Sequence, residues 1–322
     1  MKFSFIIPVK EINDYIREAV PKILEIECDD FEIIIYPDEV NNESWPKTRQ
    51  IATGHVGPAI KRSLAIKDAA GEIIIFIDDD AYPEKDFLDK LEKDFDNKEI
   101  GAVGGPAVTP KDDNFLQKVS GAVFLSSLSG GCPERYISIG QKRLVNDWPS
   151  VNLSIRKELF AKIGGFNSEY WPGEDTLLCL GIIKAGEKIL YDPELIVYHH
   201  RRAGFLKHMK QVGGYGLHRG FFAKKFPETS LKLKYFIPSL FLLFVVCGVF
   251  FSLFSKIIAN LFILGLGVYL LGVLTAIMQI KKYETWQISL ATIPYIIGTH
   301  LVYGYKFLQG LFFTKELKSK LR

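Results

Sequence analysis

The sequence predicts an α/β fold with a mostly parallel sheet for its first 200 residues, followed by transmembrane helices. Three observations lead to this prediction. Short runs of β-branched and aromatic residues alternate with segments of helical periodicity. Acidic residues directly follow some of these runs. Long segments without a charged residue fill the last third of the chain, as is typical of helices that cross a membrane.

Three apolar runs, at residues 3–9, 31–36 and 72–77, are the predicted strands of this sheet. Helical patterns at residues 15–26 and 58–70 lie between them. Strands joined by helices of this length form parallel sheets with right-handed crossovers. Ligands of such sheets bind beyond the carboxyl ends of the strands, so the residues that follow each run are the first candidates for a binding site.

The net charge of +3 conceals three regions of different composition. Residues 1–200 carry 23 basic and 34 acidic residues, residues 201–234 carry nine and one, and residues 235–322 carry eight and two. We therefore predict a domain at residues 1–202, a basic neck at 203–234 and a membrane domain at 235–322. This asymmetry favours a membrane-lipid partner over nucleic acid, and nothing in the sequence indicates a protein partner.

Three segments without Asp, Glu, Lys or Arg are candidate spans, at residues 236–254, 257–280 and 285–305. The first two are long enough to cross a hydrocarbon core of about 30 Å, and a buried helix pair in a soluble core is the alternative for them. The third contains Pro294, so either a third crossing, which we favour, or a re-entrant or interfacial segment fits it. A third crossing places four basic residues outside, against the positive-inside rule: Lys315, Lys318, Lys320 and Arg322.

The cysteine pattern and the N-terminus favour a cytoplasmic location for the first domain. The four cysteines form no Cys-x-x-Cys pair, and free thiols suit a reducing compartment. Residues 1–9 lack the apolar core and cleavage site of a signal peptide. We therefore expect a multi-pass protein of the cell membrane whose first domain lies in the cytoplasm.

Three consecutive carboxylates, Asp78, Asp79 and Asp80, follow the third apolar run. Like charges at this spacing repel one another unless something compensates them. A hard divalent cation such as Mg²⁺ or Mn²⁺ does so through oxygen ligands. The alternative is an acidic turn at the N-terminus of a helix near Lys85.

In its order of motifs the chain resembles the family 2 glycosyltransferases, whose nucleotide-sugar-binding fold is called GT-A. The resemblance covers about residues 1–205 and rests on IIPV at 6–9, GPAIKR at 57–62, AGE at 70–72, FIDDD at 76–80, Asn152, GGF at 164–166, GED at 173–175 and YHH at 198–200. It implies transfer of a sugar from a nucleotide diphosphate sugar, with inversion at the anomeric carbon. The Gln-x-x-Arg-Trp signature of processive synthases is absent, which favours transfer of a single sugar.

The resemblance also implies which residues bind the nucleotide sugar. Asp38 resembles the acid that binds the base or ribose, and Asp78 the first Asp of an Asp-x-Asp motif, with Asp79 as its less certain middle residue. Lys61 and Arg62 match nucleotide contacts, for which a solvated helix face is the alternative. The remaining candidates are a loop against the nucleobase, formed by Pro8, Val9 and Lys10, and a diphosphate clamp at Arg202. Glu11 stands where many relatives have Asn, which puts recognition of the nucleobase in doubt.

For the cation, the resemblance implies Asp80 and His199 as ligands, with His200 as the rival of His199. Neutral imidazole suits Mn²⁺ better than Mg²⁺. A structural histidine at a strand end is the alternative for either residue.

Asp175 resembles the catalytic base, which takes the proton of the acceptor hydroxyl, and Glu174 would orient the site. The alternative is a pair of carboxylates that stabilise the N-terminus of a helix at residues 176–185. Asn152 and Trp171 are candidates for binding the acceptor.

Within the neck, basic residues interspersed with apolar ones at residues 204–226 predict an amphipathic helix that lies in the headgroup layer. It would present a lipid-linked acceptor, or serve only as an anchor. Gly213, Gly214 and Gly216 are expected to loosen or break this helix. A membrane-anchored glycosyltransferase is the leading interpretation of the whole chain, and a nucleotidyltransferase of similar fold or a non-catalytic membrane scaffold are the alternatives.

Overall fold

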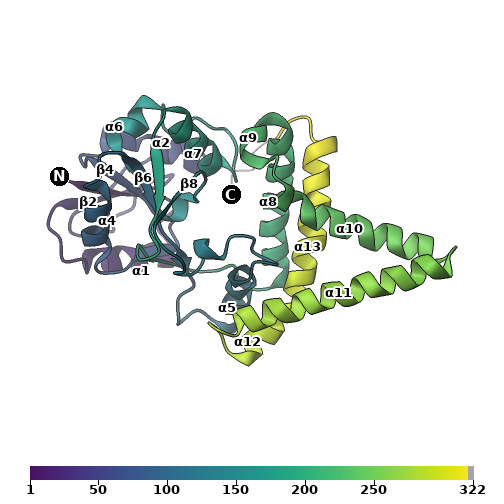
Figure 1. The fold of residues 1–322 in the computed structure, drawn as a ribbon. Coiled ribbons are helices and arrows are strands. Elements are labelled where there is room, and N and C mark those ends of the chain that lie inside the picture. Colours follow the sequence, from purple (N-terminus) through teal and green to yellow (C-terminus); the bar gives the residue numbers. More distant parts are fainter. Residues whose placement is uncertain (318–322) are drawn as a thin grey trace. The chain divides into compact units, whose positions relative to one another are not determined.

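The computed structural model describes residues 1–317, which form two compact units (Figure 1). The first unit comprises residues 1–110 and 137–200, and the second comprises residues 111–136 and 201–317. The sequence-based division assigns residues 111–136 to the first domain, whereas in the structure they pack with the C-terminal helices. Lys318, Lys320 and Arg322, which bear on the predicted third crossing, lie outside the described residues.

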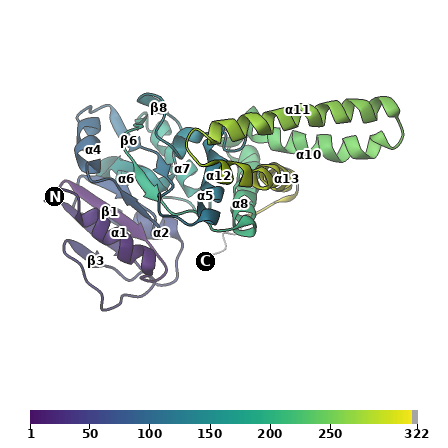
Figure 2. The ribbon, with the colours of Figure 1, turned by 90° about the horizontal axis from the view of Figure 1, so that it is seen from below.

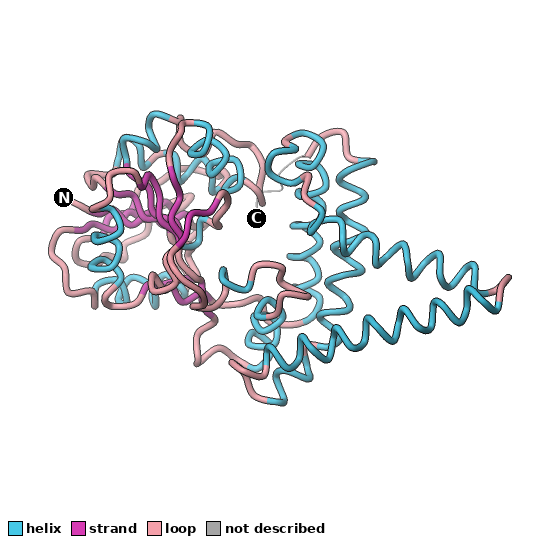
Figure 3. The backbone as a smooth tube through the Cα atoms, viewed as in Figure 1, coloured by secondary structure: helices cyan, strands magenta, loops and turns pink. Residues whose placement is uncertain are grey.

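An eight-stranded mixed sheet forms the centre of the first unit (Figure 3). β1, β2, β3 and β4 run parallel to one another, and β6 runs parallel to β10. β9 is antiparallel to both of its neighbours, so a single strand in the middle of the sheet runs against the strands on either side of it. In spatial order the strands are β3 (Thr48–Gln50), β2 (Phe31–Tyr36), β1 (Phe3–Pro8), β4 (Ile73–Phe76), β9 (Leu153–Arg156), β6 (Ile100–Gly104), β10 (Lys188–Tyr191) and β8 (Arg143–Val145).

Helices cover both faces of this sheet because alternate residues of its strands are buried on opposite sides. On β1, Phe5 and Ile7 pack against α1 (Asp14–Leu24) and α4 (Phe87–Phe95). Ile6 belongs to the opposite core, which is covered by α2 (Pro58–Ser63), α3 (Ala65–Asp68), α6 (Lys157–Lys162) and α7 (Glu174–Lys184). Burial on both faces explains why the central strands read as continuous apolar runs.

A small second sheet brings two distant segments together. β11 (Val197–His199) pairs antiparallel with β5 (Ala81–Pro83) and parallel with β7 (Ala107–Val108). In this register His199 lies opposite Ala81, the residue that follows the three aspartates. The pairing therefore carries the histidine to the acidic turn.

The second unit is helical, and two of its helices form a long hairpin (Figure 2). α10 and α11 have mean hydropathies of 2.2 and 2.4, and both are long and apolar enough to cross a membrane. The third apolar segment is instead divided at Thr292 into two helices of six and 16 residues. It therefore does not form the single spanning helix that the sequence analysis favours. The helices are α5 (Phe115–Ala122), α8 (Phe205–Lys225), α9 (Pro227–Ser230), α10 (Leu233–Ser252), α11 (Lys256–Ile280), α12 (Trp286–Ala291) and α13 (Ile293–Leu308).

The predicted neck helix is present as α8, but the prediction that its glycines would break it is wrong. α8 is continuous over 21 residues. Its glycines lie where α13 and the following turn pack closest: a Cβ at Gly216 would come within 2.6 Å of the carbonyl oxygen of Tyr303, and one at Gly220 within 2.0 Å of that of Phe307. Close backbone approach outweighs the low helix propensity of glycine here.

Gly220→Ala is expected to destabilise the second unit by about 1–3 kcal/mol, because the new methyl group overlaps backbone atoms that cannot move aside independently. Gly267→Ala in α11 is the matched control, since a Cβ there meets nothing within 4 Å. Thermal unfolding in detergent measures both. Equal melting temperatures for the two variants would contradict this account of the α8–α13 contact.

Candidate functional site

The carboxyl ends of β1, β2 and β4 lie at one edge of the sheet, and a buried lysine joins two of them. Lys61 Nζ donates to the carbonyl oxygens of Val9 at 2.6 Å and Tyr36 at 3.3 Å, and it also pairs with the carboxylate of Asp38. Only 3% of Lys61 is exposed, so the alternative of a solvated helix face is wrong for this residue. The ammonium group therefore holds the loops that follow β1 and β2 together.

Asp38 is the acidic residue at the end of β2, and both of its carboxylate oxygens have partners. Oδ1 pairs with Lys61, and Oδ2 lies 3.0 Å from Nδ1 of His55, a mostly exposed residue. Burial disfavours the charged form of Asp38, but the hydrogen bonds from Lys61 and His55 outweigh it and hold the pKa of this carboxyl below its ordinary value. Asp38 is therefore ionised at neutral pH.

Arg62 connects the acidic turn to α7. Its Nη2 donates to Asp78 Oδ1 at 2.5 Å and its Nη1 to Glu174 Oε1 at 3.1 Å. The guanidinium also lies over the ring of Phe166, 5.5 Å from its centroid. Like Lys61, Arg62 is only 3% exposed, so it too is not on a solvated face. The side chain of Arg62 therefore joins Asp78 and Glu174, two predicted site residues that lie far apart in the sequence.

Glu174 and Asp175 form the first turn of α7, after Gly173 in a left-handed conformation with φ 115°. Glu174 is buried, and this burial together with the negative charge of Asp175 raises the pKa of Glu174, against the opposing effect of Arg62. Asp175 is half-buried, and its Oδ1 accepts a hydrogen bond from the amide of Thr176 at 2.7 Å. The two adjacent carboxyl groups therefore occupy different environments, which is how neighbouring acids acquire different roles.

Asp78, Asp80 and His199 form a cluster with the donor set of a divalent-cation site. One ligand atom from each lies within 4.8 Å of the others, and His199 Nε2 is 3.1 Å from Asp80 Oδ1. Two carboxylates and an imidazole suit Mn²⁺ and other first-row cations. Of the two candidate histidines, His199 lies in this cluster, whereas His200 lies 3.2 Å from Glu18 Oε2 on α1.

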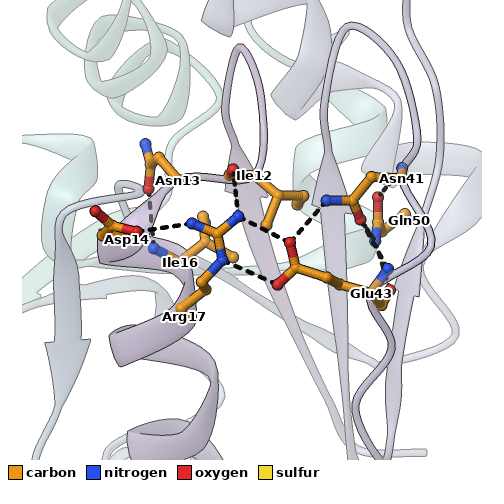
Figure 4. A network of polar contacts seen from close by, with 8 residues as sticks. All are labelled: Ile12, Asn13, Asp14, Ile16, Arg17, Asn41, Glu43 and Gln50. Carbon is orange, nitrogen blue, oxygen red and sulfur yellow. Dashed lines mark hydrogen bonds and ion pairs between the residues drawn. The ribbon is translucent and has the colours of Figure 1, made fainter.

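Asp79, the middle aspartate, contacts a residue that the sequence analysis missed. Asn13 Nδ2 donates to Asp79 Oδ2 at 2.7 Å. The signal for Asn13 was its place as N-cap of α1, one residue before the helix begins. Figure 4 shows the rest of this first turn, where Arg17 donates to both carboxylate oxygens of Glu43, at 3.0 and 2.8 Å, and so fastens α1 to the loop after β2.

The remaining predicted residues are placed as follows. Asn152 is fully buried, and its Nδ2 donates to the carbonyl oxygens of Pro106 at 3.1 Å and Leu195 at 2.7 Å. Trp171 is half-buried in the loop before α7. Pro8 ends β1, Val9 is buried after it and Lys10 is exposed, whereas Arg202 belongs to the second unit. Asn152 thus joins two loops, and a role of its amide nitrogen toward an acceptor stays a prediction.

Known proteins that are similar to this chain in sequence or structure are glycosyltransferases. The model of glycosyl transferase family 2 matches residues 4–164, half of the chain. A curated relative from Methanococcus voltae, dolichyl N-acetyl-α-D-glucosaminyl phosphate 3-β-D-2,3-diacetamido-2,3-dideoxy-β-D-glucuronosyltransferase, is 24% identical over 96% of both chains. Glucosyl-dolichyl phosphate glucuronosyltransferase from Haloferax volcanii is 23% identical over 62% of this chain and 69% of its own.

Among solved structures, the chain is similar to the mannosyltransferase PcManGT from Pyrobaculum calidifontis in complex with GDP-Man and Mn²⁺. The TM-score is 0.64 at 16% identity, and the match covers 97% of this chain and 87% of that one. The similarity establishes the fold, which agrees with the predicted nucleotide-sugar-binding architecture.

Proposed function

The chain belongs to glycosyl transferase family 2 and is a glycosyltransferase, and from this premise we propose that it transfers one sugar from a nucleotide diphosphate sugar to a lipid-phosphate-linked acceptor at a membrane. The observation that carries this proposal is the cluster of Asp78, Asp80 and His199. It lies at the carboxyl ends of the parallel strands, where Asp38 also lies. The names of the relatives from M. voltae and H. volcanii, which both refer to dolichyl phosphate-linked sugars, support the class of acceptor.

A divalent cation fits the chemistry of this cluster, because two carboxylates and an imidazole converge where three consecutive aspartates would otherwise repel one another. Asp80 and His199 would hold Mn²⁺ or Mg²⁺, with Asp78 beside them. When bound, the cation supplies positive charge for the diphosphate leaving group. Asp38, held ionised by Lys61 and His55, is suited to accept hydrogen bonds from the nucleoside.

For the reaction itself we assign the base to Asp175. Its carboxylate would take the proton of the acceptor hydroxyl as that oxygen forms a bond to the anomeric carbon and the bond to the diphosphate oxygen breaks. A single displacement of this kind inverts the anomeric carbon. Glu174 is buried and already accepts a hydrogen bond from Arg62, so it is less accessible to an acceptor hydroxyl, and through Arg62 it holds α7 to the acidic turn.

The hairpin of α10 and α11 supports a location at a membrane. Its apolar side chains are largely exposed, with Leu253 at 77% and Leu264 at 66%, and such a surface needs an apolar surrounding. Lysines lie at the two open ends of the hairpin, where Lys232 and Lys234 flank the start of α10 and Lys281 and Lys282 follow α11. We assign these ends to the cytoplasm, on the positive-inside rule.

Leu243→Arg combined with Val268→Arg is expected to release the protein from membranes. Each substitution introduces a charge within an apolar helix, at a cost of about 2.5–3.5 kcal/mol in the bilayer. The control is Leu206→Arg on α8, a residue that is 80% exposed and outside both candidate spans. Sedimentation with membranes after an alkaline wash measures the effect. An unchanged membrane fraction for the double variant would contradict the spanning hairpin.

The proposed function is tested with the full-length protein in detergent and a panel of nucleotide sugars. The panel includes activated glucuronic acid and mannose, and a polyprenyl phosphate-linked sugar serves as acceptor. We expect Mn²⁺- or Mg²⁺-dependent transfer of one sugar with inverted anomeric configuration, read by mass spectrometry and NMR of the product. A nucleoside monophosphate attached to the acceptor, with release of the sugar 1-phosphate, would instead indicate a nucleotidyltransferase. Absence of metal-dependent nucleotide binding would indicate a scaffold.

A further inference from the structure

Helix α1 contacts two residues that adjoin the candidate cation ligands in sequence. Asp79 lies between Asp78 and Asp80, and Asn13 donates to it at 2.7 Å. His200 directly follows His199, and Glu18 Oε2 lies 3.2 Å from its Nε2. The cluster is built from two chain segments, the turn after β4 and the end of β11, and α1 contacts one residue of each.

The amide of Asn13 has a fixed orientation. Its Oδ1 accepts the hydrogen bond from the amide of Ile16 that caps α1, at 3.0 Å, so Nδ2 is the group that faces Asp79. An uncharged donor compensates the middle carboxylate without bringing a cation that would compete with a metal ion. The N-terminus of α1 adds its partial positive charge beside the same carboxylate.

On the other segment, the side chain of His200 lies near Glu18 and also makes a ring contact with α1. Tyr15 of α1 lies with its ring centroid 5.0 Å from that of His200. The amide of His200 also donates to the carbonyl oxygen of Asp80 at 3.0 Å, so the two segments are joined directly. His200 is therefore restrained twice, by its backbone amide on Asp80 and by its side chain against α1.

We propose that the first turns of α1 position the divalent-cation site, with Asn13 and Glu18 as positioning residues that hold Asp79 and His200 while Asp78, Asp80 and His199 converge. Neighbours in a turn and at a strand end share backbone torsions, so fixing the residue next to a ligand restricts that ligand. This inference rests on the cation site of the proposed function. It adds residues from a helix that contributes no ligand to the cluster.

The test compares two asparagines that cap helices. Ser is an equally good N-cap residue, so Asn13→Ser keeps the cap of α1 but is too short to donate to Asp79. Asn114→Ser is the matched control, because Asn114 caps α5 by the same type of bond, at 3.1 Å to the amide of Gln117. Mn²⁺ alone is titrated into the full-length protein, and free Mn²⁺ is followed by electron paramagnetic resonance.

We expect Asn13→Ser to weaken Mn²⁺ binding about 10-fold, the lower end of the range for direct partners of metal ligands, because Asn13 acts through the neighbour of two ligands; the melting temperature should not change. Its activity should return when Mn²⁺ is raised. Glu18→Gln should weaken binding in the same direction, and Asn114→Ser should leave it unchanged. Equal affinities for wild type, Asn13→Ser and Glu18→Gln would overturn the role of α1. Absence of Mn²⁺ binding by the wild type would overturn the proposed site instead, so the two failures are distinguishable.

Discussion

Asp80→Asn is expected to abolish metal-dependent sugar transfer and to weaken Mn²⁺ binding more than 100-fold. Replacing partners outside the coordination shell already costs about 10–100-fold in affinity, and Asp80 would be a direct ligand. The carboxylate of Asp80 is buried, 3.1 Å from His199, within a run of three acids. Removing one charge from this run relieves repulsion, so the unfolding temperature without metal should not fall. Mn²⁺ titration, transfer assays and thermal unfolding measure the three quantities.

Asp68→Asn is the control for this substitution. Asp68 is a half-buried carboxylate of the same unit that accepts a hydrogen bond from the hydroxyl of Tyr36 at 3.1 Å and lies outside the cluster. Its replacement should leave Mn²⁺ affinity unchanged. If Asp80→Asn bound Mn²⁺ like the wild type, the cluster would not be the metal site.

Asp175→Asn is expected to lower the turnover number for sugar transfer by about 10²–10⁴, the usual contribution of a general base. The amide cannot accept the proton of the acceptor hydroxyl, but it keeps the size of the side chain. Binding of the nucleotide sugar should persist, because Asp38, Lys61 and the cation cluster are unchanged. Single-turnover transfer and calorimetric binding of the donor separate the two effects.

Glu158→Gln is the matched control, because Glu158 is also an acidic residue in the first turn of a helix. If Asp175 only stabilised the N-terminus of α7, both substitutions would produce similar small losses of stability and no loss of turnover. A turnover number for Asp175→Asn close to that of the wild type would sink the assignment of the base. Loss of donor binding would move Asp175 to the nucleotide site.

The candidate cluster was largely predictable from the sequence because parallel strands end at one edge. Once residues 3–9, 31–36 and 72–77 are recognised as strands, Asp38 and the three aspartates must lie near one another. The position of His199 in this cluster could be predicted only from the family resemblance. The antiparallel pairing of β11 with β5, which places it there, joins residues more than 100 positions apart. No local pattern specifies such a pairing.

Lys61 and Arg62 show where local reasoning fails. In the sequence they are two charges on a short helix, which suggests either a solvated face or contacts with a nucleotide. In the structure both are buried, one joining strand ends and the other joining the acidic turn to α7. Their acceptors come from four separate segments, so burial became visible only when those segments were assembled.

In the apolar C-terminal region, too, one part could be predicted from the sequence and another part could not. Length and composition were sufficient to predict α10 and α11 as long apolar helices, because each uncharged segment has about the 20 residues that such a helix needs to cross a bilayer. Composition could not predict that the third segment would break at Thr292 and pack along α8, or that the glycines of α8 would lie at this contact. Those outcomes depend on how closely two backbones approach.

By itself, the sequence determined the α/β class, the two apolar helices and the acidic turn, because periodicity, apolar length and adjacent charges are local properties. The tertiary structure decided that His199 rather than His200 faces Asp80, that Lys61 and Arg62 are internal, and that Asn13 contacts Asp79. Each of these depends on strand register or on the packing of α1. The physical reason is that hydrogen bonds and burial between distant segments are set by the whole fold, and the same local sequence is compatible with several such partners.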